Sequence, residues 1–322
     1  MTMTTATTGG RPATRFVVDG TEYGGGPATL SFGRLAGAVF TADPAAVGRL
    51  LPSPLLHPVR WFNGRAVVIV AAGDTVMRIG ALPPFRVAEV DCAAMVTYGP
   101  SRPVPVLPVA GALLPLVGGA VDRRYRAGLW PLAGISTNRV AAEVSRLLFG
   151  LPKQVASVRE DRSPDRLRFT ATDPSGALIL DLEVPAGGRA SPVDQVGYDY
   201  FVAGSALVRS TNHDTGSQAV QLGGSRARLR LGQHPLADPL RRIGLSPRPL
   251  MAIVGHPYSQ TVDRAPERLA PATQPPPAPA AAEPVIAPMV IGHEDGHEET
   301  VDQLPDGLPF NASGTFEPHP EG

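Results

Sequence analysis

The sequence predicts an α+β fold built on a barrel-like, strongly curved antiparallel sheet with a few short helices. Short apolar runs bounded by Gly, Pro and Asx turns recur along the chain, as expected for antiparallel strands. Helical periodicity is confined to a few short segments. The chain has 322 residues, of which 43% are apolar, and this is enough to bury a substantial core.

The charge and cysteine content exclude several classes of protein. Lys and Arg number 29, as do Asp and Glu, which argues against a nucleic-acid partner because phosphate contact needs a clustered basic surface. Cys92 is the only cysteine, so no internal disulfide forms and a reducing compartment fits. The first ten residues have neither a basic start nor an apolar run, so no signal peptide is expected. We therefore expect a cytoplasmic protein.

The first half of the chain supplies one short helix and several strands. Asp43 predicts a helix N-cap and Pro44 the first helical residue, because Asp accepts the free amides of a first turn and Pro is tolerated there. The helix stops at two prolines shortly afterwards. Strands are expected in three apolar stretches, Leu35–Phe40, Trp61–Asp74 and Phe85–Tyr98.

Residues 104–121 are uncharged over 18 positions, the shortest length that could span a membrane. Three prolines and three glycines in this stretch interrupt a continuous helix. An apolar loop over a pocket, or a subunit contact, is therefore favoured. We expect no membrane partner, although this insertion is the one place where such a contact could form.

The second half predicts short antiparallel strands, one helix at Asn138–Phe149 and another at Leu236–Ile243. The domain is expected to span residues 15–265, with a disordered N-terminus at 1–14 and a disordered Pro/Ala-rich tail at 266–322. The expected strands are Val155–Glu160, Arg166–Thr172, Ala177–Val184, Tyr198–Ser210, Gln218–Leu231 and Leu250–Val254.

Lys153 is the only lysine, so the other 28 of the 29 basic residues are arginines. It follows a helix and a Gly-Leu-Pro turn, among apolar neighbours. Poor solvation there predicts a lowered pKa for the Lys153 amine. A neutral amine attacks a ketone to form an iminium, which accepts electrons when a neighbouring bond breaks. The alternative is a lysine whose stem covers apolar surface while its ammonium reaches water.

The segment FGLPKQVASV, residues 149–158, resembles the acetoacetate decarboxylase superfamily, whose catalytic lysine follows a proline in a turn after a helix. Three other segments are similar to that family in the same order along the chain. They are FTADPAAVGRLLPSPL at 40–55, PFRVAEVDCAAMV at 84–96, and GGSRARLRL with HPLADPL within 223–240. The resemblance covers about residues 40–254. It implies a cone-like antiparallel β-barrel and a homo-oligomer.

The resemblance also implies roles for individual residues. Lys153 takes the Schiff-base position, Glu89 the position of a pocket glutamate, and Arg34 is the candidate for binding a substrate carboxylate. Strand alternation places Glu89 and Asp91 on one face, which could instead be a solvated face.

Two positions depart from the family pattern. Gln154 stands where the decarboxylases have a second lysine, and is a candidate substrate contact. Val68 stands where they have a second glutamate. These departures leave both the substrate and the reaction open.

The sequence therefore predicts a Schiff-base lyase acting on a small keto acid, with decarboxylation of a β-keto acid such as acetoacetate placed first. The alternatives are a Schiff-base aldolase or dehydratase acting on 2-oxo acids, and a non-catalytic small-molecule-binding protein. No metal or organic cofactor is expected, because the iminium does the chemistry a cofactor would supply. His293 and His297 lie in the expected tail without a rigid scaffold, so no metal site is assigned to them.

Overall fold

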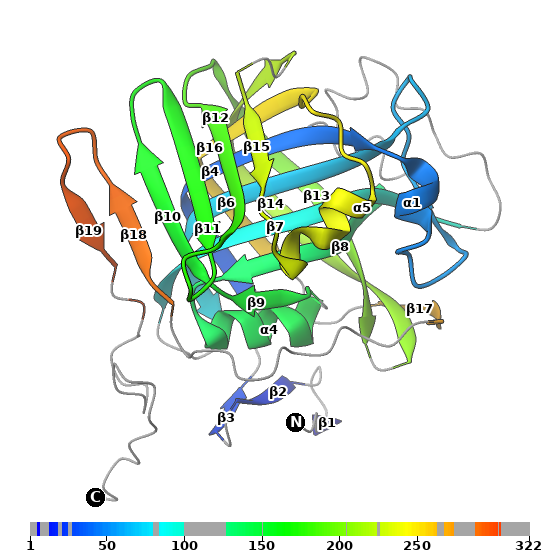
Figure 1. The fold of residues 1–322 in the computed structure, drawn as a ribbon. Coiled ribbons are helices and arrows are strands. Elements are labelled where there is room, and N and C mark those ends of the chain that lie inside the picture. Colours follow the sequence, from blue (N-terminus) through cyan, green and yellow to red (C-terminus); the bar gives the residue numbers. More distant parts are fainter. Residues whose placement is uncertain are drawn as a thin grey trace, which may run out of the picture.

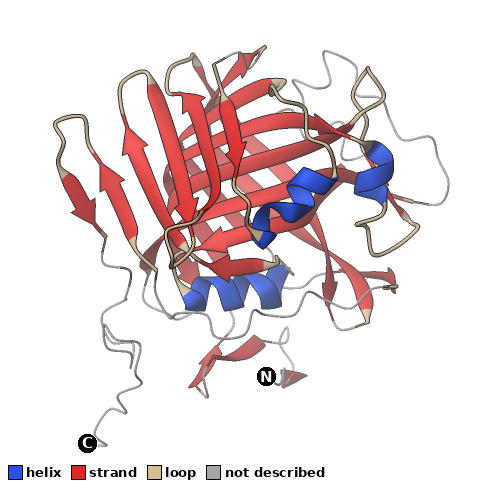
Figure 2. Ribbon diagram, viewed as in Figure 1, coloured by secondary structure: helices blue, strands red, loops and turns tan. Residues whose placement is uncertain are grey.

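Strands make up most of the computed structural model, and its helices are short (Figure 2). The helices are α1 (Pro44–Gly48), α4 (Arg139–Phe149), the 3₁₀ turn η1 (Pro235–Ala237) and α5 (Asp238–Arg242). The structure describes residues 5–6, 13–18, 21–24, 28–79, 84–99, 127–149, 151–203, 205–223, 226–262, 267–273, 287–301 and 303.

Seven long strands form a ring (Figure 1), because β8 at the end of the series pairs back onto β7 at its start. Neighbours around the ring are antiparallel except β8 and β13, which run parallel. Their order is β7 (Phe85–Tyr98), β6 (Ala66–Ile79), β4 (Ala28–Ala42), β16 (Met251–Val262), β14 (Ala206–Leu222), β13 (Ala190–Ala203) and β8 (Ala127–Ser136). Three short strands pair onto them: β5 (Leu56–Pro58), β9 (Lys153–Val155) and β17 (Glu267–Pro271).

A second sheet packs on the outside of the ring, in front of it in Figure 1. Val68 and Val90 of the ring share one apolar core with Phe169 and Leu182 of this outer sheet. Burial of these side chains is the main favourable term that holds the two layers together. The outer sheet has the order β15 (Arg228–Leu231), β12 (Leu178–Pro185), β11 (Arg166–Thr172), β10 (Ser157–Arg162), β18 (Met289–Gly292) and β19 (Glu298–Thr300).

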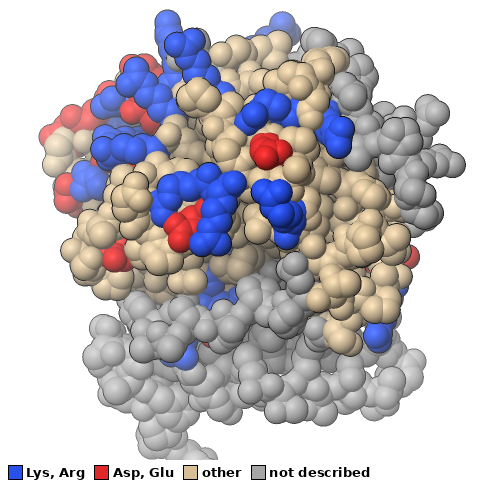
Figure 3. Space-filling view, turned by 45° about the vertical axis from the view of Figure 1, so that its right-hand side comes forward, with Lys and Arg blue, Asp and Glu red and all other residues tan. Residues whose placement is uncertain are grey.

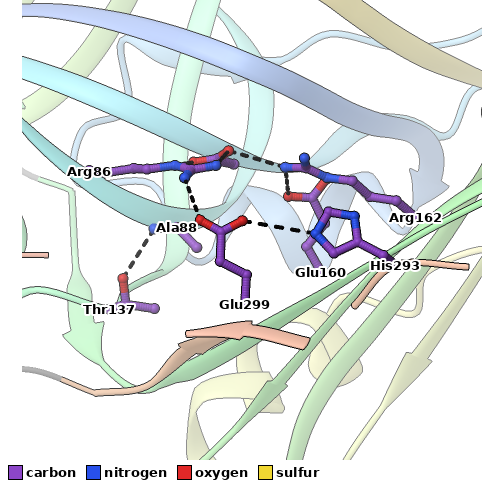
Figure 4. Close-up of polar contacts among 8 residues, drawn as sticks. Arg86, Ala88, Thr137, Glu160, Arg162, His293 and Glu299 are labelled. Atoms are coloured by element: carbon purple, nitrogen blue, oxygen red, sulfur yellow. Dashed lines mark hydrogen bonds and ion pairs between the residues drawn. The ribbon is translucent and has the colours of Figure 1, made fainter. Parts of the chain in front are cut away.

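An ion-pair cluster also links the two layers (Figure 4). Arg86 of β7 donates to Asp74 of β6 at 2.8 Å, and Arg162 of β10 donates to the same carboxylate at 3.2 Å. Arg162 also donates to Glu160 at 2.6 Å, and Arg86 reaches Glu299 of β19 at 3.4 Å. Asp74 and Glu160 are buried, so each needs the cation it contacts.

Arginine side chains stand out on the face seen in Figure 3, some with acidic side chains beside them. On the outer sheet, Arg168 and Arg230 both contact Asp181, at 2.8 and 3.2 Å. Opposite charges therefore meet on this sheet.

Several sequence predictions agree with these elements. β7 has the predicted bounds, and α4 begins one residue after the predicted Asn138. The Asp43 side chain accepts the amide of Ala45 at 2.9 Å and so caps α1 as predicted. The expected single strand Tyr198–Ser210 is instead the junction of the β13–β14 hairpin.

The expected disordered tail contributes strands β17, β18 and β19, so the expectation of disorder is wrong for these described parts of residues 266–322. β18 pairs in parallel with β10, and its Met289 and Ile291 are buried in the core. Met289 and Ile291 lie just after the Pro/Ala-rich run. The composition of that run led to the prediction of disorder for the whole tail. At the other end, β1 (Thr5–Ala6), β2 (Ala13–Val18) and β3 (Thr21–Gly24) form a small sheet that begins inside the expected disordered N-terminus.

The apolar stretch at 104–121 lies outside the described residues. Within the part of the chain that is described, no helix has the length and apolar character needed to cross a membrane.

Candidate active site

Lys153 is held at the start of β9 by a turn that follows helix α4. The Asn138 side chain caps α4 by accepting the amides of Val140 and Ala141, at 2.8 and 3.3 Å. After the helix, the Lys153 amide donates to the carbonyl of Leu151 at 2.7 Å, and the Arg146 guanidinium donates to the Lys153 carbonyl at 2.7 Å. The turn thus fixes the backbone from which the lysine side chain extends.

Gly134 lets the Lys153 side chain pass close to β8. The two residues are partners in the parallel β8–β9 pair. A Cβ atom at position 134 would lie 2.6 Å from Lys153 Cγ and 3.1 Å from Asp91 Oδ1. Contacts this short require a residue without a side chain.

The Lys153 ammonium meets two carboxylates of β7. Its Nζ lies 2.7 Å from Glu89 Oε1 and 3.2 Å from Asp91 Oδ2. Lys153 and Glu89 are 1% and 2% exposed, whereas the Asp91 side chain is 37% exposed. The alternation that placed Glu89 and Asp91 on one face is correct, and that face is the inside of the ring.

The three charges determine one another's protonation. Burial alone lowers the pKa of Lys153, but the charges and hydrogen bonds of Asp91 and Glu89 outweigh it and hold the pKa above its usual value. The predicted lowering of this pKa is therefore wrong in the free protein, because it left out the two carboxylates. Burial raises the pKa of Glu89 above its usual value, against the opposing effect of Lys153. Lys153 thus lies between two carboxyl groups, and burial raises the pKa of Asp91 as well as that of Glu89.

A cavity of about 290 Å³ lies inside the ring, and Glu89 and Asp91 belong to its wall. Lys153 is not among the described lining residues, but its Nζ contacts the two carboxylates that are. One part of the wall is apolar and includes Val39, Trp61, Val67, Ile69, Met95 and Met251.

Another part of the wall carries polar side chains of β13, β14 and β16, none of which was predicted from the sequence. Asp214 lies in β14 and lines the cavity. Asp199 of β13 and Asn212 of β14 line it too, and the Asn212 amide donates to Asp199 at 2.5 Å. Desolvation raises the pKa of Asp199 to about 7. In β14 the run from Arg209 to Gln218 is polar throughout apart from Gly216, so no alternation in the sequence marked the side chains that face the cavity.

The other predicted site residues do not reach the described cavity wall. Arg34 is absent from the lining although Phe32 and Leu35 belong to it, because the strand register shifts between residues 32 and 34. Its charge acts on Glu160 in the ion-pair cluster instead. Gln154 is half-buried beside Lys153 and is not a lining residue, and Val68 is buried in the core.

Among the described residues, no three His, Cys, Asp or Glu side chains are grouped as they would be to hold a metal ion. His293 and His297 stack on each other in the β18–β19 turn, with ring centroids 5.9 Å apart.

No protein-family model and no curated protein matches the sequence. Solved structures do match. One is MppR, an enzyme of enduracididine biosynthesis, in complex with the condensation product of pyruvate and imidazole 4-carboxaldehyde. The TM-score is 0.52 at 13% identity, over 76% of this chain and 90% of that one.

The acetoacetate decarboxylase of Legionella pneumophila subsp. pneumophila str. Philadelphia 1 matches with a TM-score of 0.51 at 13% identity, over 77% of this chain and 88% of that one. A second acetoacetate decarboxylase structure matches with a TM-score of 0.52 at 14% identity, over 76% and 90%. Identities this low establish the fold alone. The fold predicted from the sequence is confirmed: the chain has the fold of acetoacetate decarboxylase and MppR.

Proposed function

We propose that this protein is a lyase that forms an iminium between Lys153 and the carbonyl group of a small substrate. The observation that supports this best is the chain's only lysine, buried, with its Nζ 2.7 and 3.2 Å from two carboxylates in a cavity wall. Nucleophilic lysines occur at desolvated positions such as this one. The likeness in fold to enzymes supports the same reading.

The first step moves a proton from Lys153 to Glu89, whose Oε1 is within hydrogen-bond distance of Nζ. The neutral amine then attacks the carbonyl carbon and gives a carbinolamine. A carboxyl group returns the proton to the hydroxyl, which leaves as water, and the nitrogen lone pair forms the iminium double bond. The cation that results stays beside two carboxylates.

The second step uses the acidity of the carbon next to the iminium. Asp91, the more exposed of the two carboxylates, takes a proton from that carbon and leaves an enamine. The enamine either adds to an aldehyde, as in an aldol reaction, or expels a hydroxyl group as water. Hydrolysis of the iminium then releases the product and restores the Lys153 amine.

A second candidate reaction is decarboxylation of a β-keto acid such as acetoacetate, which the likeness in fold to acetoacetate decarboxylases favours. The iminium would accept the electrons of the breaking C–C bond, carbon dioxide would leave, and a carboxyl would protonate the enamine. The described cavity wall contains carboxylates and no arginine, so a substrate carboxylate would bind beside like charge. The same argument applies to 2-oxo acids, so it favours aldol or dehydration chemistry on a carbonyl compound without a carboxylate over either class of keto acid expected from the sequence.

Reductive trapping tests the proposal. Wild-type protein is incubated with sodium cyanoborohydride and either acetoacetate or pyruvate, and intact mass and peptide mapping locate the adduct. We expect one reduced adduct on Lys153, and none there in Lys153→Met. With an adduct in hand, carbon dioxide release from acetoacetate is compared with turnover of pyruvate plus an aldehyde. No adduct on folded wild-type protein with any carbonyl compound would leave the binding-protein alternative.

A further inference from the structure

The cavity has a second polar wall that the proposed iminium chemistry does not use. Asp199 and Asp214 lie on the neighbouring strands β13 and β14, and both face the cavity. Asp214 accepts hydrogen bonds from Gln195 at 3.3 Å and Gln260 at 3.1 Å. Among the described residues, the Asp199 side chain accepts one hydrogen bond, from Asn212. Asp199 therefore has acceptor capacity left over.

Asn212 points to a ligand independently of the acidic groups. Its side chain is 3% exposed and lines the cavity. Its Nδ2 donates to Asp199, but its Oδ1 is buried and has no hydrogen-bond partner among the described residues. A buried carbonyl oxygen without a donor is costly, and a ligand that supplies an N–H group would relieve that cost.

The charged groups of the described cavity wall indicate whether that ligand is positively or negatively charged. Four carboxyl groups belong to this wall: Glu89, Asp91, Asp199 and Asp214. The Lys153 ammonium contacts the first two, and no described arginine lines the cavity. The charge of Lys153 also acts on Asp199, but no described cation contacts the Asp199 carboxylate, and Asn212 Oδ1 beside it has no hydrogen-bond partner among the described residues.

We propose that Asp199 and Asn212 bind a cationic group of the substrate that carries several N–H donors, such as an amidinium or guanidinium. One N–H donates to the Asp199 carboxylate and another to Asn212 Oδ1, because these two acceptors are adjacent on paired strands. This inference rests on the proposed function, in which Lys153 takes the carbonyl group of the same molecule. It makes the substrate a basic carbonyl compound in place of a simple keto acid.

Three ligands with the same butyl chain and head groups of different charge test the site: butylguanidinium, valeramide and valerate. Isothermal titration calorimetry at pH 8 measures the affinity of each for the wild-type protein. We expect butylguanidinium to bind at least tenfold more tightly than valeramide, and valerate to bind most weakly. Equal affinity for the three ligands, or tighter binding of valerate, would overturn the proposal without any variant.

The variant Asp199→Asn removes the charge and keeps the shape of the side chain. We expect it to lose at least tenfold in affinity for butylguanidinium and to keep its affinity for valeramide. The matched control is Asp194→Asn, an exposed aspartate on the same strand, which should retain the wild-type preference. An unchanged preference in folded Asp199→Asn protein, checked by circular dichroism, contradicts the assignment.

Trapping of acetone on Lys153 separates this inference from the proposed function, because acetone has no cationic group. Normal trapping of acetone with no preference for butylguanidinium refutes the cation site and leaves the iminium chemistry. A clear preference for butylguanidinium with no trapping retains the cation site and refutes the iminium chemistry.

Discussion

Gly134→Ala places one methyl group between β8 and the Lys153 side chain, and we expect it to impair imine formation strongly. The new Cβ would lie 2.6 Å from Lys153 Cγ, whereas carbon atoms pack at about 3.5–4.0 Å. The lysine stem must therefore retreat by about 1 Å. Cγ is close to the backbone and Lys153 Cα is only 3.5 Å from the new atom, so a simple rotation of the side-chain end does not relieve the contact.

The magnitude follows from two general costs. Adding a methyl group to a packed interior destabilises a protein by about 1–3 kcal/mol. A displacement of about 1 Å at a reacting group costs roughly 100-fold in rate. The displacement also strains the contacts of Nζ with Glu89 and Asp91, which are 2.7 and 3.2 Å long. We therefore expect a protein that folds at reduced stability and traps carbonyl compounds on Lys153 about 100-fold more slowly.

The assay compares the rate of cyanoborohydride trapping with acetone, and the thermal midpoint, in Gly134→Ala and in Gly187→Ala. Gly187 is a matched control because a Cβ there meets no atom within 4 Å. We expect Gly187→Ala to behave as wild type in both measurements. Trapping at the wild-type rate in Gly134→Ala would refute the argument that this glycine positions the lysine.

Three other substitutions test the charges of the cavity. Lys153→Met should abolish the reduced adduct at this position, as read by peptide mapping. Glu89→Gln removes a charge that holds the pKa of Lys153 up, so the rate of cyanoborohydride trapping should begin to rise at a lower pH than in wild type. Turnover should fall by about 10²–10⁴ because the group that takes the proton is lost. The control Glu294→Gln, at an exposed residue, should leave the pH dependence of trapping unchanged. Asp199→Asn should stabilise the free protein at pH 8 by on the order of 2–4 kcal/mol and by less at pH 5. In the wild-type protein the pKa of Asp199 is raised to about 7, so the unfolded chain ionises first and the folded protein loses stability as pH rises toward 7. Equal increases in the free energy of unfolding at pH 5 and pH 8, measured by denaturant unfolding, would contradict this.

The elements found from sequence are those whose signals are local. β7 has its predicted bounds because an apolar run with period-two alternation ends at Gly99 and Pro100. The α1 cap was predicted because Asp43 and Pro44 act within one helical turn. Alternation also placed Asp91 beside Glu89, although it could not say that this face lines a cavity.

The missed parts of the site depend on contacts between distant segments. Asp199 and Asn212 join Glu89 in one cavity because pairings between strands far apart in the sequence, including those of β8 with β7 and β13, close the ring. No pattern within one strand encodes those pairings. Arg34 lies off the described cavity wall because one irregular residue in β4 changes which side chains face the cavity, and the resemblance that suggested Arg34 carried no information about this irregularity.

In the proposed mechanism the carboxylates beside Lys153 act mainly on the iminium. The iminium has one positive charge at Nζ, as the ammonium does, so Glu89 and Asp91 can stabilise it without rearranging. The demanding step is then the loss of the ammonium proton, which must precede attack. Burial raises the pKa of Glu89, so this carboxylate takes the proton at a smaller cost than an exposed one would. The resulting amine and carboxylic acid are both neutral, and neutral groups are the form that a desolvated wall tolerates best. Burial raises the free energy of this ion pair, and it therefore also favours formation of the neutral amine that acts as the nucleophile.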